Sequence, residues 1–423
     1  MEAEAGTAQA GSAPLDLGGL ALWLVERGMR GLPIGEQLAG YCERVRDAGF
    51  PMCRAQIGMN ALHPRYGAHT FIWRPGSRAV DYVPRERSIE NRQVYLRSPI
   101  HHMRSGAILA RRWRLDDAAA DAFPLFAELR AEGLTEYAAR LVPFDPDAAA
   151  RDLRAFDAAG GTAPSLDGIF FSCATDRADG FDDGQLAQVV DTLPFLALAI
   201  KARLTYDVAH TVVQTYLGRD AGERVLTGAI ERGSAETIRA VLWFSDLRGF
   251  TRLTDRLPRD ALIETLDDYL EAMARPVHDN GGQILKFLGD GLLAVFDLTG
   301  RDSAAVCREA LNAAAALRTD FPGFNAARAE AGKPVMDFGL ALHLGDVLYG
   351  NIGAVGRLDF TVVGPAVNEA SRIQALCRPM ERNVLISSSF RDSLGAAGGL
   401  QSLGFHPLRG VAEPQELFTL PDG

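Results

Sequence analysis

The most informative stretch of the chain is a continuous apolar run that leads directly to an acidic residue. It reads Ala240-Val241-Leu242-Trp243-Phe244-Ser245-Asp246, and Leu247-Arg248-Gly249-Phe250-Thr251 follows it. An unbroken apolar run is typical of a strand that is buried on both faces of a sheet. The segment after Asp246 opens a predicted helix, where unpaired backbone amides attract phosphate. We therefore expect a metal-binding carboxylate beside a phosphate site.

A second acidic residue lies at the tip of a predicted hairpin. Residues 260–277 have the apolar periodicity of a helix, and Asn280-Gly281-Gly282 is a stop signal for it. Residues 283–288 and 292–296 then have the pattern of strands, joined by the tight turn Gly289-Asp290-Gly291. If this hairpin pairs with the strand that ends at Asp246, the two carboxylates meet. Either aspartate alone would be an ordinary turn residue or helix cap, but together they suit Mg²⁺ or Mn²⁺.

Four ordered motifs extend this pattern over the C-terminal part of the chain. They are residues 244–251, 282–290, 359–372 and 408–411. With these motifs, residues 239–420 resemble the class III adenylyl and guanylyl cyclase catalytic domain. The resemblance implies an α+β fold for residues 239–423, with a ferredoxin-like βαββαβ core. It also implies a homodimer, because in this family the metal-binding and purine-reading residues of one site come from opposite subunits.

The resemblance assigns the metal side of the site. Asp246 and Asp290 match the family's two metal-binding aspartates, which implies two Mg²⁺ or Mn²⁺ ions per active site. The carbonyl of Leu247 is expected to be an additional metal ligand. The triphosphate is expected beside Gly249, Phe250 and Thr251.

The resemblance also assigns the nucleotide side of the site. Lys286 and Thr361 match the two residues that read the purine edge. Asn368 and Arg372, one helical turn apart, match the pair that orients the ribose and stabilises the transition state. Arg409 occupies the place of a basic residue that contacts the terminal phosphates. Taken singly, each of these residues has an ordinary structural explanation, and only their joint order gives them these roles.

The expected reaction is the conversion of ATP to 3',5'-cyclic AMP and pyrophosphate. Lys286 can only donate hydrogen bonds and Thr361 can accept them, which favours adenine over guanine. Two alternatives remain, a guanylate cyclase and a catalytically silent cyclase-like module that binds nucleotides for signalling. A diguanylate-type cyclase is disfavoured, because residues 287–291 lack the Gly-Gly-Asp/Glu-Glu-Phe hairpin of that class.

The N-terminal part of the chain has a different pattern. Residues 15–45 and 115–133 are predicted to be helical, and strands are expected within residues 53–83, at 137–142 and at 168–174. A strand, the acidic turn at Asp182 and Asp183, and a long exit helix resemble the closing elements of a GAF or PAS sensor domain. Residues 15–200 are therefore expected to form an α/β sensor that receives a small-molecule or protein signal. A plain dimerisation domain is the alternative.

The remaining segments connect or precede these domains. Residues 201–238 are predicted to be a helical connector with a hinge at residues 218–222. Residues 1–14 are rich in alanine and glycine and contain no lysine or arginine, so we expect a disordered tail without a targeting signal.

Composition narrows the function classes. The 423 residues carry a net charge of −10, which gives no basic footprint for a nucleic-acid partner. The strongly apolar stretch at residues 193–200 is too short to cross a membrane. Five scattered cysteines without close pairs fit free thiols in the cytoplasm.

Overall fold

The structure is a computed structural model that describes residues 16–63, 65–77, 79–117, 122–145, 168–395, 399–411 and 413–421. The chain divides into two compact units, Met1–Val212 and Val213–Gly423. The predicted tail at residues 1–14 lies outside the described residues. Within the described ranges, no helix combines the length and the apolar character that crossing a membrane requires. All five cysteines are free thiols.

The N-terminal unit is built on a six-stranded antiparallel sheet with the strand order β3-β2-β1-β6-β5-β4. The strands are β1 (Arg54–Asn60), β2 (Tyr66–Trp73), β3 (Asp81–Glu86), β4 (Ala110–Arg114), β5 (Glu136–Pro143) and β6 (Gly168–Thr175). The helices are α1 (Leu17–Met29), α2 (Ile34–Asp47), α3 (Ile89–Leu96), α4 (Pro99–Ser105), α5 (Pro124–Ala131) and most of α7 (Asp183–Leu217). Helices α1, α2 and α7 share a core with one face of the sheet, and α4 and α5 share a second core with the other face.

Most elements predicted for this unit are confirmed. The predicted helices at 15–45 and the predicted strands at 53–83, 137–142 and 168–174 correspond to elements of the structure. Asp182 caps α7, because its side chain accepts a hydrogen bond from the backbone N–H of Gln185 at 2.9 Å. The helix predicted over residues 115–133 is wrong in extent, since residues 115–117 form a turn after β4 and α5 begins only at Pro124. Proline is tolerated at that first position because its missing N–H would be unpaired there anyway.

The C-terminal unit has a sheet with the strand order β13-β14-β12-β10-β7-β9-β8, and β11 pairs with β10. Its strands are β7 (Ala235–Arg248), β8 (Gln283–Leu288), β9 (Gly291–Asp297), β10 (Asp337–Ala354), β11 (Arg357–Val363), β12 (Val384–Ser387), β13 (Gln401–His406) and β14 (Gln415–Thr419). Its helices, besides the end of α7, are α8 (Arg219–Leu226), α9 (Phe250–Thr254), α10 (Arg259–Asp279), α11 (Ser303–Glu330), α12 (Pro365–Leu376) and α13 (Ser388–Leu394).

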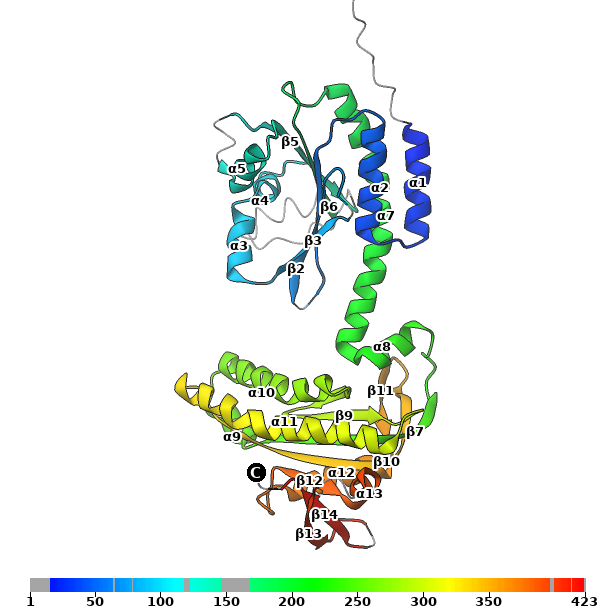
Figure 1. Cartoon of the computed structure of the whole chain (residues 1–423), viewed down its shortest axis with the longest axis vertical. Helices are drawn as coiled ribbons and strands as arrows, with labels where there is room; N and C mark the ends of the chain where they lie inside the picture. The colour runs from blue at the N-terminus through cyan, green and yellow to red at the C-terminus, as the bar shows by residue number, and fades with distance from the viewer. Residues whose placement is uncertain are drawn as a thin grey trace, which may run out of the picture. The chain divides into compact units, whose positions relative to one another are not determined.

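The ferredoxin-like core predicted for this unit is confirmed. Strand β7, helix α10, the β8–β9 hairpin, helix α11 and strand β10 follow one another as βαββαβ. Helices α10 and α11 cover one face of the sheet, and α12 lies on the other face (Figure 1). Val241 and Trp243 belong to the first core, whereas Ala240 and Leu242 belong to the second. Strand β7 is therefore buried on both faces, which explains its continuous apolar run.

The connector is shorter as a helix than the sequence suggested. Helix α7 ends at Leu217, Gly218 has a φ of 85°, and α8 ends at Leu226. Residues 235–238, predicted to be helical, instead begin β7, because Ile238 is paired with Val347 of β10. The phenol of Tyr349 on β10 donates a hydrogen bond of 2.9 Å to Asp220 of α8. This bond attaches α8 to the sheet of the C-terminal unit.

Candidate active site

The two predicted metal-binding aspartates lie side by side. Strand β7 pairs antiparallel with β9 so that Asp246 is opposite Gly291, directly after Asp290. The backbone N–H of Leu247 donates to the carbonyl of Asp290 at 3.2 Å. A Cβ added to Gly291 would lie only 2.4 Å from the carbonyl oxygen of Ser245, so this close approach of the two strands requires glycine. The hairpin predicted from the sequence therefore brings the carboxylates together as expected.

The electrostatics of this pair suit a divalent cation. Burial, together with the charge of Asp290 and a hydrogen bond to it, raises the pKa of Asp246 to about 6. A carboxylate next to a second carboxylate is stabilised by a positive charge between them. Among the described residues, no group of three or more His, Cys, Asp or Glu side chains is arranged to hold a metal. Two carboxylates with further oxygen ligands from substrate are the usual arrangement for Mg²⁺.

The predicted phosphate segment turns sharply after β7. Gly249 has a φ of 90° and is the N-cap of the short helix α9, which begins at Phe250. Phe250 packs partly against the core, and Thr251 is exposed. The backbone N–H groups at this start therefore lie only a few residues beyond Asp246 in the chain.

The two predicted purine-reading residues come from neighbouring strands. Lys286 on β8 is paired with Leu293, which faces the α12 side of the sheet, and its Nζ lies 3.9 Å from the carboxylate of Asp359. Asp359 and Thr361 are two residues apart on β11 and hence lie on the same face of that strand. The Thr361 side chain is 4% exposed, and its hydroxyl has no hydrogen-bond partner in the described part of the chain. A buried hydroxyl without a partner is unusual, and it leaves Thr361 able to form a further hydrogen bond.

Helix α12 carries the predicted ribose and transition-state residues. Asn368 is exposed and Arg372 is half-buried. A Cβ added to Gly410 would lie 3.4 Å from Nη2 of Arg372, so the guanidinium reaches the loop that contains the exposed Arg409. The structure thus brings Arg372 and the Arg409 loop together, although residues 373–408 separate them in the sequence.

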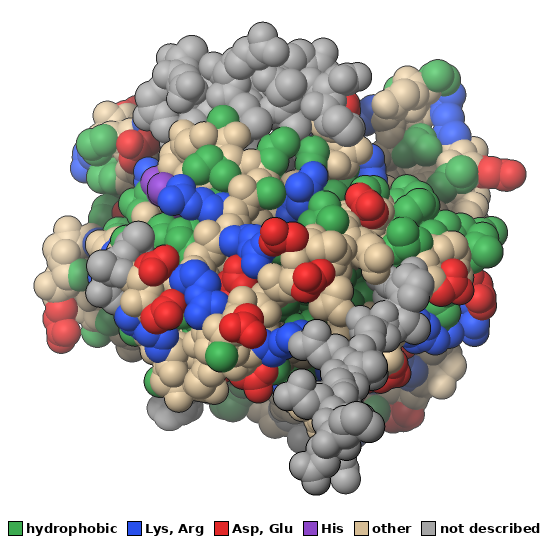
Figure 2. Space-filling model, turned by 90° about the horizontal axis from the view of Figure 1, so that it is seen from above, with side chains coloured by type: hydrophobic (Ala, Val, Ile, Leu, Met, Phe, Trp, Pro, Cys, Tyr) green, Lys and Arg blue, Asp and Glu red, His purple; other side chains and the backbone are tan. Residues whose placement is uncertain are grey.

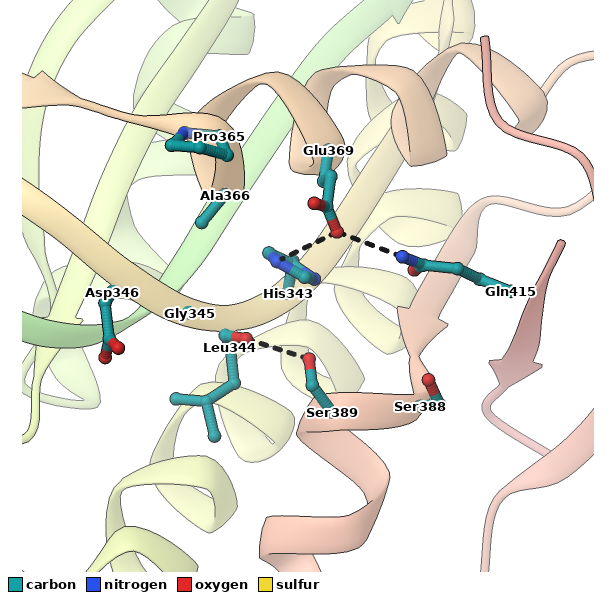
Figure 3. A pocket seen from close by; sticks show the side chains of 10 residues that line it. All are labelled: His343, Leu344, Gly345, Asp346, Pro365, Ala366, Glu369, Ser388, Ser389 and Gln415. Atoms are coloured by element: carbon teal, nitrogen blue, oxygen red, sulfur yellow. Dashed lines mark hydrogen bonds and ion pairs between the residues drawn. The ribbon is translucent and has the colours of Figure 1, made fainter. Parts of the chain in front are cut away.

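A pocket of about 470 Å³ lies beside the start of α12 (Figure 3). Its central residue is Glu369, which follows Asn368 directly. The Glu369 carboxylate accepts a hydrogen bond of 3.0 Å from Nε2 of Gln415 on β14 and lies 3.7 Å from Nε2 of His343 on β10. Burial lowers the pKa of His343, while Glu369 acts in the opposite direction. Glu369 therefore links α12 to two strands of the sheet.

Asp359, His343, Glu369 and Gln415 were not identified from the sequence. Glu369 carried a signal, because it is a charged residue one helical turn from the apolar Ala366 and Ile373, which are both buried. Its partners carried none, since the contact of His343 with Glu369 depends on how α12 lies over β10. Sequence spacing cannot supply that geometry.

Large apolar side chains are exposed next to several of the predicted site residues. Phe287 and Leu288, between Lys286 and Asp290, are 53% and 40% exposed. Leu348 and Val363 are opposite each other on β10 and β11 and are 47% and 38% exposed. Exposed apolar side chains grouped around polar site residues are typical of a surface that a protein partner covers.

Comparisons with known proteins agree with this geometry. Residues 234–419 match the family described as the adenylate and guanylate cyclase catalytic domain. Adenylate cyclase of Anabaena cylindrica is 36% identical over 164 residues, which are 38% of this chain and 32% of that protein. Adenylate cyclase 2 of Rhizobium meliloti is 30% identical over 219 residues, which are 50% of this chain and 57% of that protein.

Among solved structures, the adenylyl cyclase CyaB from P. aeruginosa has 25% sequence identity and a TM-score of 0.41, and the match covers 45% of this chain and 97% of that one. The chain spans less than two thirds of the length of the two curated relatives. The four motifs, the paired aspartates and the family match concern the same segment of the chain. Residues 234–419 are a member of the adenylate and guanylate cyclase catalytic domain family.

Proposed function

We propose that this chain is an adenylate cyclase, which converts ATP to 3',5'-cyclic AMP and pyrophosphate as a homodimer. The observation that carries the proposal is the pairing of Asp246 with Asp290 at the end of β7, next to the start of α9. Relatives named adenylate cyclase support the same activity.

Each residue of the site has a distinct task in this reaction. Asp246 and Asp290 would hold two Mg²⁺ or Mn²⁺ ions, with the Leu247 carbonyl as a further ligand, and the ions would supply Lewis acidity toward the ribose 3'-hydroxyl and the phosphates. The backbone amides at Gly249 to Thr251 would bind the triphosphate. Arg372 would face the negative charge that develops at the α-phosphate when the 3'-oxygen attacks, and contributions of this kind often amount to roughly a hundredfold in rate.

The remaining residues would bind the nucleotide. Asn368 would orient the ribose, and Arg409 would contact the terminal phosphates. Lys286 would donate a hydrogen bond to the adenine edge, and the unpartnered hydroxyl of Thr361 would accept one from the exocyclic amine. An amine donor with a hydroxyl acceptor is complementary to adenine and supports ATP as the substrate.

A second copy of the chain is the proposed partner. The exposed Phe287, Leu288, Leu348 and Val363 flank the purine-reading strands and support burial of this surface in a homodimer.

On the face drawn in Figure 2, Lys and Arg side chains lie among Asp and Glu side chains and do not gather into one basic patch. The five free thiols support a cytoplasmic location.

The N-terminal unit would regulate the enzyme. Helix α7 begins in that unit and ends at Leu217, and only Gly218 separates it from α8. A signal that moves α7 would therefore act on α8, which the hydrogen bond from Tyr349 attaches to the sheet. Deletion of residues 1–205 tests this step, and a truncated protein with unchanged activity and unchanged response to effectors would contradict it.

The deciding experiment measures cyclic nucleotide production by the purified full-length protein with ATP or GTP, and with Mg²⁺ or Mn²⁺. We expect cyclic AMP from ATP, at background level in Asp246→Ala. Cyclic GMP as the main product would identify a guanylate cyclase instead. Metal-dependent ATP binding without any cyclic product would identify the silent module.

A further inference from the structure

Four polar side chains lie on one face of the N-terminal sheet, on three neighbouring strands. Arg54 of β1 is opposite Ala174 of β6, and Ala174 is opposite Tyr137 of β5. One row further along, Gln56 of β1 is opposite Ser172 of β6. Tyr137 and Ala174 belong to the core on the α4 and α5 side, so all four polar residues face that side. We refer to Arg54, Gln56, Tyr137 and Ser172 as the Arg54 cluster.

The cluster is buried and its polar atoms are poorly satisfied. Arg54, Gln56, Tyr137 and Ser172 are at most 9% exposed. Within the part of the chain that the structure describes, Nε of Arg54 and the hydroxyls of Tyr137 and Ser172 have no hydrogen-bond partner. Since buried polar groups are normally hydrogen-bonded, three unsatisfied atoms on adjacent strands point to a group that they bind together.

Arg54 also brings a buried positive charge into the cluster. Its Nη2 donates to Oε1 of Gln56 at 2.9 Å, but among the described residues no carboxylate lies within ion-pair distance of its guanidinium. Glu128 of α5 and Glu132, directly after α5, act on it only at longer range, and Arg74 opposes them. Burying a charge without an opposite charge is costly, and arginine remains protonated even when buried. The cluster therefore has a positive charge without a matching negative one.

The other members of the cluster do not supply that charge. Burial raises the pKa of Tyr137 to about 12, so its phenol is neutral, while the neighbouring Ser172 hydroxyl and Arg54 act in the opposite direction. Ser172 acts on the phenol as a nearby hydrogen-bonding hydroxyl, but the pair falls short of good hydrogen-bond geometry, so both hydroxyls can still bind another group. A neutral hydroxyl can donate a hydrogen bond as well as accept one. Ala174, a small side chain, lies between Arg54 and Tyr137.

We propose that the Arg54 cluster is a binding site for a small molecule that carries a carboxylate or phosphate group. The guanidinium would bind two oxygens of the anion through its parallel N–H groups. The hydroxyls of Tyr137 and Ser172 would donate to the remaining oxygens. The site lies in the N-terminal unit, so it goes beyond the proposed cyclase reaction and does not depend on it.

The test titrates the full-length, metal-free protein with sodium phosphate and, separately, with sodium succinate, against sodium chloride at equal ionic strength. The melting temperature and the hydrogen exchange of residues 54–60 and 168–175 are measured. We expect at least one of the two anions to raise the melting temperature by about 5 °C at a concentration 100 times its Kd. The same anion should protect both segments from exchange. The anion that does so shows whether phosphate or carboxylate is preferred.

Two variants and a matched control connect this effect to Arg54. Arg54→Met should fold at least as well as the wild type, because it removes an unpaired buried charge, and it should lose the response. Arg54→Lys keeps the charge without the planar fork and should weaken binding about tenfold. Arg85→Met changes an exposed arginine of β3 and should respond like the wild type.

Three results would overturn the proposal. The first is a wild-type protein whose β1 and β6 amides are unaffected by both anions. The second is an Arg54→Met protein that responds as the wild type does. The third is an Arg54→Lys protein that binds with unchanged affinity, since the fork would then have no role.

Discussion

At the scale of single residues, Asp246 and Asp290 lower the stability of the metal-free protein because they form the proposed metal site. Asp246 is half-buried and next to Asp290, so without a cation the folded protein is strained by two like charges. A carboxyl group whose pKa is raised in the folded state holds its proton more tightly there than in the unfolded chain. The metal-free protein therefore loses stability as the pH rises from about 4 to about 6, and a bound cation restores it.

Asp246→Asn should consequently stabilise the metal-free protein while it abolishes cyclase activity. At pH 8 we expect a gain of about 1 kcal/mol after solvent screening, or about 2–4 °C in melting temperature. At pH 5 the gain should shrink, because Asp246 is then largely protonated in the wild type. Thermal denaturation in EDTA at both pH values measures this. Asp267→Asn, on the exposed face of α10, is the matched control.

Glu369 shows how a residue without substrate contact can affect turnover. It connects α12 to β10 and β14 and directly follows Asn368, so it would act on the proposed catalytic residues by positioning their helix. In Glu369→Ala we expect kcat to fall about tenfold, corresponding to about 1.4 kcal/mol, while KM for ATP changes little. Steady-state kinetics beside Glu330→Ala, an exposed change on α11, tests this. A rise in KM at unchanged kcat would assign Glu369 to substrate binding instead.

At the scale of elements, the predictable parts were those with local signals. The apolar run of β7, the Gly-Asp-Gly turn and the stop signal after α10 are all encoded within a few residues, and each is confirmed. The helix predicted over residues 115–133 was wrong in extent because its apolar residues pack into one core from two local structures. Leu115 lies in a turn, and Phe123 directly precedes the short helix α5. Periodicity reports burial, and two different local structures can bury the same residues.

Contacts between elements that are far apart in the sequence could not be predicted from local sequence patterns. The unpartnered hydroxyl of Thr361 and the approach of Arg372 to Gly410 depend on how β11, α12 and the loop after β13 are placed. The family resemblance singled out Thr361 and Arg372, but it did not indicate Glu369 or the Arg54 cluster. Both are recognised from the burial of polar side chains and from which of these side chains have hydrogen-bond partners, and these properties depend on the three-dimensional structure.

The attachment of α8 gives an element-scale prediction. The buried Tyr349 donates to Asp220, which also accepts a 2.9 Å bond from Nε of Arg224. Tyr349→Phe keeps the packing and removes one hydrogen bond, so we expect a loss of about 1 kcal/mol and a melting temperature about 2–4 °C lower. Hydrogen exchange should rise in residues 219–226. Tyr216→Phe, an 80% exposed position on α7, should change neither quantity.

At the scale of the whole molecule, the proposed reaction requires two chains for each active site. One chain carries every site residue, yet the proposal assigns Asp246 and Asp290 to one subunit of a site and Arg372 to the other. Asp246→Ala and Arg372→Ala should each be inactive as homodimers. A mixed dimer of the two variants contains one site with both intact residues and one site with neither.

Mixing the two inactive proteins should therefore restore activity. If subunits exchange freely, half of the dimers are mixed and each has one working site, so the mixture should recover about one quarter of the wild-type rate per chain. Co-expression with two different affinity tags and isolation of the mixed dimer should raise this to about one half. If each active site were built within a single chain, neither preparation would gain activity, because no chain in it has both residues. The recovered fraction therefore measures directly whether the catalytic residues act across the subunit interface.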